Sequence, residues 1–497
     1  MKKVNTIYVL SLLITLIMTL AIVSCNKDDI HITKILNEEI NIFPDYKDIV
    51  IPCNIAPMNF SVCDSDNYCT IIKGEKNSFQ VHSNDGLFEI PLKKWRALLK
   101  ENRGKKITFT IAHQQGNEWY AYNSFAMEVA NDSIDKYLVY RLIPPYEQWL
   151  KMGIFQRNLE NYEQDPIYEN RLTGYNCVNC HSFPMQNPDK MLFHMRAKDA
   201  NGTVLINHGD VQKINTKTPE TISNLVYPYW HPSGKYVAAS TNIFHQSYFY
   251  NHDDRVEVYD VNSDVVVYDI ENKQLLSCNV LNDKHVFETF PSFSPDGKSF
   301  YFCTTPALDS VPDNISKMKY SLCRIDFNPE TRTFGTEVDT LFDANKDGRS
   351  INFPRVSPDG KYMIVTLTNY CNFPINHKDA DLFAIDMNTG ELTALDMLNS
   401  DEAESYHSWS HNSRWMVYSS RRIDGLYTRP FFSYIDNNGV AHKPFLLPQK
   451  NPAKFYSDFM FAYNIPELVR DKVKVNPHKI AEVMSNRHAG TNLTFKR

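Results

Sequence analysis

Four segments of this chain repeat one pattern, and a repeat of this kind restricts the fold more than any other feature of the sequence. The segments start at Tyr227, Phe290, Phe353 and Tyr406, at intervals of 63, 63 and 53 residues. In each, a short apolar run leads through a tight turn, of Pro-Asp-Gly type in two of them, into a second apolar run. Proline presets φ, aspartate caps its own turn and glycine accepts positive φ, so each segment is predicted to be a β-hairpin.

A second hairpin signal follows each segment, as in the run from Val265 to Lys273. Four strands per unit, repeated along the chain, predict the blades of a β-propeller. The units resemble the Ser-Pro-Asp-Gly-Lys repeats of TolB-type, WD40-like propellers. This resemblance implies an all-β fold with a propeller of five to six blades over residues 176–465. Five blades are visible, and the segment from Phe455 to Ile465 is expected to close the ring or to begin a sixth.

A c-type haem motif, Cys177-Val-Asn-Cys180-His181, stands at the start of the propeller. In such a motif two thiols add across the haem vinyl groups and the adjacent histidine becomes an axial ligand of the iron. The motif aligns with the first strand of the repeat, so we expect it in the first blade. This reading predicts one covalent haem c held by Cys177, Cys180 and His181.

The alignment also suggests a second iron ligand. His181 takes the place that proline holds in three repeats, and in the last repeat that place is held by His407. The first and last blades of a closed propeller are neighbours, so His181 and His407 are predicted to be the proximal and distal metal ligands. His194 is a rival cofactor-binding residue. The further rivals are Met185, Met191 and Met195.

Two classes of function follow. The first is electron transfer by a haem lipoprotein to an unknown redox partner, or reduction of peroxide or another small molecule if the iron has an open site. The second is a non-enzymatic propeller that binds a protein or a glycan, with Cys177 and Cys180 joined in a disulfide. Half of a zinc site is a weaker reading of the same cysteines. No nucleophile elbow, phosphate loop or His-Glu-x-x-His motif is present.

The sequence before the propeller has a pattern of its own, which predicts a separate domain. Short β-type runs alternate with turn residues over 41–145, which predicts an immunoglobulin-like β-sandwich. One amphipathic helix is expected from Pro91 to Arg103. Residues 146–175 are interpreted as a connector and residues 466–497 as a C-terminal tail.

The N-terminus is typical of an exported lipoprotein. Lys2 and Lys3 precede an apolar run that ends in Ile22-Val23-Ser24-Cys25, which resembles a lipobox. A signal peptide over 1–24, lipid attachment at Cys25 and a linker over 25–40 are therefore predicted, with the membrane as a partner through the lipid. The following Lys-Asp-Asp is similar to export tags of Bacteroidetes surface lipoproteins, which implies the outer membrane, on its surface or its periplasmic face. A net charge of −6 argues against nucleic-acid binding.

Two further features of the sequence are weaker candidates for functional sites. Arg421 and Arg422 are candidates for contacts with haem propionates, although surface ion pairs are the more common role of such residues. The run from Asp343 to Gly348 looks like the start of a calcium loop but lacks the glutamate at the twelfth position, which favours a polar turn.

Overall fold

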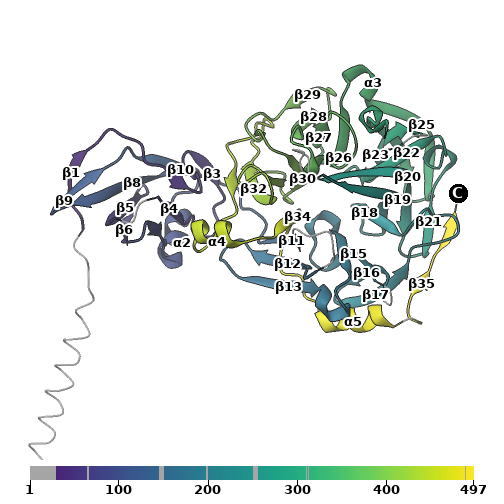
Figure 1. Cartoon of the computed structure of the whole chain (residues 1–497), viewed down its shortest axis with the longest axis horizontal. Coiled ribbons are helices and arrows are strands. Elements are labelled where there is room, and N and C mark those ends of the chain that lie inside the picture. Colours follow the sequence, from purple (N-terminus) through teal and green to yellow (C-terminus); the bar gives the residue numbers. More distant parts are fainter. Residues whose placement is uncertain are drawn as a thin grey trace, which may run out of the picture.

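The computed structural model describes residues 29–63, 66–144, 150–197, 200–249, 256–308, 311, 313–486 and 488–496. Nearly all regular structure in these residues is β, in two parts that lie side by side (Figure 1). The predicted lipid-attachment residue Cys25 and the signal peptide lie outside the described residues. Among the described residues, no helix combines the length and the apolar character needed to cross a bilayer.

The N-terminal part is built on a seven-stranded sheet. Its members are β1 (Ile32–Ile35), β3 (Ile49–Ile51), β5 (Tyr68–Lys73), β6 (Ser78–Ser83), β8 (Lys105–Gln115), β9 (Glu118–Ala121) and β10 (Phe125–Val129). A smaller sheet joins β2 (Ile42–Phe43), β4 (Phe60–Val62) and β7 (Leu87–Phe88). The expected amphipathic helix is present as α2 (Leu92–Glu101), which buries Trp95, Leu98 and Leu99 in the core. The predicted β-sandwich is confirmed.

The rest of the described chain forms a six-bladed β-propeller, in which six sheets of four or five strands surround a central axis (Figure 1). Blade 1 contains β34 (Ala462–Val469), β11 (Tyr137–Ile143), β12 (Gly153–Asn158) and β13 (Gln164–Glu169). Blade 2 contains β14 (Cys177–Ser182), β15 (Lys190–Arg196), β16 (Gly202–Asn207) and β17 (Asp210–Asn215). Blade 3 contains β18 (Leu225–Trp230), β19 (Tyr236–Tyr248), β20 (Val256–Asp269) and β21 (Gln274–Leu276).

The other three blades follow in sequence. Blade 4 contains β22 (Val286–Phe293), β23 (Ser299–Pro306), β24 (Ser321–Asn328) and β25 (Thr333–Phe342). Blade 5 contains β26 (Ser350–Val356), β27 (Tyr362–Thr368), β28 (Asp381–Asp386) and β29 (Leu392–Ala394). Blade 6 contains β30 (Glu404–Trp409), β31 (Trp415–Ser420), β32 (Arg429–Tyr434) and β33 (Phe445–Leu446).

The ring is closed by strands from opposite ends of the propeller sequence. In blade 1 the innermost strand, β34, comes from near the C-terminus and pairs antiparallel with β11, which directly follows the N-terminal part. Strand β11 therefore belongs to the propeller, although the sequence placed residues up to 145 in the sandwich. The segment from Cys177 lies in blade 2, not in the first blade, because β11 to β13 precede it in the ring.

The chain after β34 runs along the outside of the ring. Helix α5 (Pro477–Ser485) buries Ile480 and Met484 against blades 1 and 2. Strand β35 (Thr491–Asn492) then extends blade 2, and β36 (Thr494–Lys496) extends blade 3. The residues interpreted as a tail thus tie two blades together. Short helices α3 (Ala344–Asp347) and α4 (Pro452–Asp458) lie in connections.

Polar contacts join the two parts of the molecule. The hydroxyl group of Tyr46 donates to the carbonyl of Leu446, and the indole of Trp415 donates to the carbonyl of Asp132. The buried carboxylate of Asp135 pairs with His411 of blade 6. One apolar core runs through the sandwich and into blades 5, 6 and 1. The sandwich is therefore packed against the propeller as part of one folded unit.

Candidate functional site in the propeller channel

Each innermost strand carries the same backbone irregularity at the same place. One non-glycine residue there has φ near +50°, and the register of pairing shifts at that point in every blade. These six residues, here called the channel ring, are Cys180, Tyr227, Phe290, Phe353, Tyr406 and Ile465. A left-handed conformation costs a non-glycine residue about 1–3 kcal/mol, so it persists only where the surrounding packing fixes it.

Aromatic side chains of the channel ring pack on one another. The ring centroids of Phe290 and Phe353 are 4.0 Å apart, those of Tyr227 and Phe290 are 4.7 Å apart, and those of Phe353 and Tyr406 are 5.1 Å apart. Phe290 is completely buried. The six innermost strands run in the same direction along the propeller axis. Residues that precede the channel ring in each strand therefore lie on one side of the ring, and residues that follow it lie on the other side.

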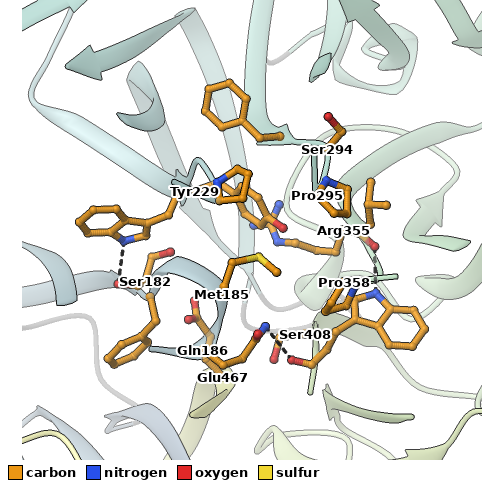
Figure 2. Close-up of a pocket in the computed structure, with 16 residues that line it drawn as sticks. Ser182, Met185, Gln186, Tyr229, Ser294, Pro295, Arg355, Pro358, Ser408 and Glu467 are labelled. Atoms are coloured by element: carbon orange, nitrogen blue, oxygen red, sulfur yellow. Dashed lines mark hydrogen bonds between the residues drawn. The ribbon is translucent and has the colours of Figure 1, made fainter. Parts of the chain in front are cut away.

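A pocket lies on the side that follows the channel ring (Figure 2). Two positions beyond the ring the blades present Ser182, Tyr229, Ser292, Arg355, Ser408 and Glu467. All of these except Ser292 line a cavity of about 60 Å³, here called the channel pocket. Trp230 and Trp409 form part of its wall, and their indoles donate to the carbonyls of Ser182 and Arg355. The half-exposed side chain of Met185 also borders it.

Arg355 is the cationic group of the channel pocket. Its guanidinium lies over the ring of Tyr229, 4.8 Å from the centroid, and Nη1 donates to the carbonyl of Pro354 at 2.9 Å. It forms no ion pair with another described residue. Burial lowers the pKa of Arg355, and the nearby groups of Tyr229 and Glu467 act in the opposite direction. Arg355 therefore lines the pocket without an ion-pair partner in the described part of the chain.

Glu467 is the acidic group of the same pocket. Burial raises the pKa of its carboxyl group to about 8, although Arg355 and the backbone N–H of Phe183 act to lower it. Near neutral pH the carboxyl group is therefore largely protonated, while the guanidinium stays charged. The channel pocket consequently carries a net positive charge.

The predicted haem residues lie beside this pocket but are packed into the blades. Cys177 and Cys180 are buried free thiols on β14. His181 and His407 both border a second cavity of about 40 Å³, next to the channel pocket. They belong to blades 2 and 6, which blade 1 separates, so these blades are not neighbours as the sequence suggested.

Each candidate histidine has a structural environment of its own. His407 Nε2 lies 2.9 Å from the carbonyl oxygen of Ile364 in blade 5. His194 Nδ1 lies 3.3 Å from the hydroxyl oxygen of Thr203 within blade 2. The ring of His181 is 2% exposed, and neither of its nitrogens makes a hydrogen bond of ordinary geometry. Burial lowers the pKa of all three imidazoles to about 3.

The prediction of a haem protein in electron transfer is wrong. A cofactor of drug size occupies a pocket of roughly 300–1,000 Å³, whereas the cavity beside Cys180, His181 and His407 measures about 40 Å³. The described residues also bring together no group of three or more His, Cys, Asp or Glu side chains able to hold a metal ion. The alternative prediction, a binding module with a Cys177–Cys180 disulfide, is wrong about the disulfide, because both cysteines are free thiols.

The weaker sequence candidates have ordinary structural roles. Arg421 Nη2 donates to the side chain of Asn376, and Arg422 Nη2 lies 3.0 Å from a carboxylate oxygen of Glu404. The Asp343 side chain caps the single turn of α3 by accepting from the N–H of Asn345. The run that looks like a calcium loop is therefore a capped polar turn.

Sequence reasoning missed Arg355 and Glu467, although a signal for both was present. Arg355 follows the repeat's Phe353-Pro354 pair, and Glu467 follows Ile465-Pro466 in the same way. The sixth repeat was not recognised because it lies in a strand far along the chain from the rest of its blade. The shared position after the proline identifies both residues once the six repeats are aligned.

Comparisons with known proteins find only weak structural similarities. No family model matches the sequence, and no curated protein matches it. Solved structures similar to the chain include prolyl oligopeptidase B from Galerina marginata, bound to a 25mer macrocyclization substrate, with 9% identity and a TM-score of 0.34. Another is dipeptidyl peptidase 4 of Porphyromonas gingivalis, with 11% identity and a TM-score of 0.30. A third is a DUF4784 family protein from Bacteroides caccae, with 8% identity and a TM-score of 0.28.

The matches differ in how much of each known protein they cover. The match covers 67% of this chain and 42% of the prolyl oligopeptidase, and 71% of this chain and 59% of the dipeptidyl peptidase. The chain thus spans less than two thirds of either peptidase. For the DUF4784 protein the match covers 72% of this chain and 95% of that protein.

Proposed function

We propose that this protein is a ligand-binding propeller whose channel pocket holds the carboxylate group of a small molecule or of a chain end. The observation that carries the proposal is the half-buried guanidinium of Arg355, which lines the pocket and has no anionic partner among the described residues. A partly desolvated arginine is stabilised when its donors are used, and a carboxylate matches its planar fork.

The surrounding groups support an anion. Hydroxyl groups of Tyr229 and Ser182 line the same pocket, and the protonated form of Glu467 is a further donor. A volume of about 60 Å³ has room for roughly four to six water-sized groups. This is enough for a carboxylate and the first atoms attached to it. The rest of a larger ligand would extend past Met185, which borders the pocket and is half-exposed.

The proposal is tested by isothermal titration calorimetry with matched small probes. Acetate and glycylglycine carry the carboxylate, whereas acetamide and glycinamide lack it. Binding of the first pair and none of the second is expected. Arg355→Gln should weaken binding at least about tenfold, because losing one partner of a buried charged contact costs about 2–5 kcal/mol.

Two further variants identify the cause of that loss. Arg355→Lys keeps the charge without the fork and should bind with intermediate affinity if the contact is bidentate. Arg324→Gln is the matched control, because Arg324 lies on the exposed face of blade 4 and pairs with Asp339 there. Equal binding of the carboxylates and their amides, or unchanged affinity in Arg355→Gln, would refute the proposal.

We also propose that the chain is held at a membrane by lipid on Cys25. The support is the lipobox-like sequence that ends at this cysteine, after a basic start and an apolar run. Metabolic labelling with radioactive palmitate should mark the wild-type protein and not Cys25→Ser. The matched control is Cys63→Ser, which changes an exposed cysteine of the sandwich. Equal labelling of the wild type and Cys25→Ser contradicts the anchor.

The side of the outer membrane is a separate part of this proposal. Protease added to intact cells should digest the protein if it lies on the surface, and should leave it intact until the cells are lysed if it faces the periplasm. We propose the surface, on the basis of the Lys27-Asp28-Asp29 cluster that follows the cysteine.

A further inference from the structure

A buried carboxylate that pairs with no cationic side chain of the described residues lies on the other side of the channel ring. Asp260, on β20 of blade 3, is completely buried. Its Oδ2 accepts hydrogen bonds from the amide groups of Asn242, at 2.8 Å, and Asn372. Its Oδ1 has no hydrogen-bond partner among the described residues. One of the two oxygens of this buried carboxylate, Oδ1, is thus without a hydrogen bond among the described residues.

Two amide oxygens in the same cluster are also unsatisfied. The Oδ1 atoms of Asn242 and Asn352 are buried, and neither has a partner in the described chain. Asn242 Nδ2 binds Asp260 and lies 3.4 Å from the hydroxyl oxygen of Thr289. Asn352 Nδ2 lies 3.4 Å from the carbonyl of Cys371, which precedes Asn372 in the chain. These contacts connect Asn242 and Asn372 directly to Asp260, and they place Asn352 beside the residue that precedes Asn372.

The cluster joins three blades at the channel. Asn242 and Asp260 come from blade 3, Thr289 from blade 4, and Asn352 from blade 5. Thr289 and Asn352 directly precede Phe290 and Phe353 of the channel ring. This places the cluster on the opposite side of the ring from the channel pocket, so the two sites are separate.

Within the described part of the chain, no cationic side chain pairs with Asp260. Burial raises the pKa of the Asp260 carboxyl group to about 7, and only the two asparagine amides oppose that effect. The pKa of Tyr227 is raised by burial and then by the charge of Asp260, and the same two causes act on Tyr320. Nearby Glu257 is engaged by His377, with Nε2 and Oε1 3.1 Å apart. A buried carboxylate in such surroundings is costly unless a cation joins it.

We propose that Asp260, Asn242 and Asn352 bind a hard metal cation, with Ca²⁺ as the ion that suits them best. Ca²⁺ accepts carboxylate, amide and hydroxyl oxygens in a flexible geometry and keeps some water ligands. Mg²⁺ requires near-ideal octahedral geometry and loses its water less readily, which suits a set dominated by neutral amides less well. The ion would use the three unsatisfied oxygens and neutralise Asp260, and so would hold blades 3, 4 and 5 together at the axis.

The test uses the whole protein, freed of metal with EDTA and then dialysed into a buffer of about pH 8, where the Asp260 carboxyl group is mostly ionised. CaCl2 is titrated in by calorimetry, and thermal unfolding is followed with and without saturating Ca²⁺. Saturable binding of one ion per chain and a rise in Tm are expected, because a ligand that binds only the folded state stabilises it. NaCl, KCl and MgCl2 at matched ionic strength should give a smaller shift.

Two variants separate this site from a general effect of the ion. Asp260→Asn should lose the Ca²⁺ response, while its Tm in EDTA should stay the same or rise, because the substitution removes a buried charge without a partner. Asp264→Asn is the matched control, since Asp264 is a partly buried carboxyl group on the same strand, and its response to Ca²⁺ should be that of the wild type.

A second readout follows the ion directly. Tb³⁺ substitutes for Ca²⁺ and emits when a nearby tyrosine is excited, so Tyr227 and Tyr320 should sensitise its emission in the wild type and not in Asp260→Asn. Absence of Ca²⁺ binding in the wild type would overturn the proposal and indicate that water alone satisfies these oxygens. An equal Ca²⁺ response in Asp260→Asn would overturn it as well.

Discussion

The buried histidines predict a specific sensitivity of this protein to acid. His407 is 3% exposed and burial lowers the pKa of its imidazole to about 3, compared with about 6.5 in an unfolded chain. When folding lowers the pKa of a base, the unfolded state takes up the proton at a higher pH than the folded state does. The folded state therefore loses stability as the pH falls below about 6.5, and the loss continues down to about 3.

The size of the effect follows from these two pKa values. Between about pH 7 and pH 5, one such histidine lowers the free energy of unfolding by about 2 kcal/mol. His181 and His194 have the same depressed pKa and add similar amounts. Buried carboxyl groups with raised pKa values, such as Glu467, act in the opposite direction over part of this range. A difference between variants isolates the contribution of one histidine.

The perturbation is His407→Gln, which keeps a side-chain donor near the carbonyl of Ile364 but does not titrate. Urea unfolding is followed by tryptophan fluorescence at several values between about pH 7 and pH 5. The substitution lowers the free energy of unfolding by some amount at about pH 7. This difference between wild type and variant should be smaller by about 2 kcal/mol at about pH 5. His285→Gln, at an exposed position, is the control. A cost that does not change with pH refutes the reasoning.

Three other predictions concern the channel and the contact between the two parts. Affinity of the channel pocket for acetate should fall as the pH rises through about 8, because ionised Glu467 then offsets the arginine, and calorimetry on Glu467→Gln should show no such fall. Phe290→Ala should lower the free energy of unfolding by about 3–5 kcal/mol in urea titrations, since Phe290 is completely buried. Hydrogen bonding to Asp135 raises the pKa of His411, so Asp135→Asn should cost more stability below about pH 6.5 than at alkaline pH, by under about 1 kcal/mol.

Local patterns predicted the propeller well because the four main strands of blades 2 to 6 come from contiguous stretches of chain. The turn after Phe290 has Pro-Asp-Gly at its reversal, and the structure forms β22 and β23 on either side of it. The alignment of His181 with Pro228 is also confirmed, since Cys180 and Tyr227 before them share the same left-handed backbone. Periodicity and turn chemistry are properties of neighbouring residues, and they survive in the folded protein.

The haem prediction failed for a different reason. The spacing of Cys177, Cys180 and His181 states which groups are near one another, but not whether space exists for a macrocycle beside them. In the folded chain β14 is covered by its own blade and by blade 1, and the three side chains are buried. A motif match holds only in the structural context that its chemistry requires.

The sequence by itself determined the fold class and the four-stranded repeat of the blades. The tertiary structure alone decided how the ring closes, because β34 and β11 pair across more than 300 residues of chain. It also decided which polar groups meet. Arg355 and Glu467 share a pocket, and Asp260 meets the amides of Asn242 and Asn372, because burial and charge depend on what packs around a residue rather than on its neighbours in the chain.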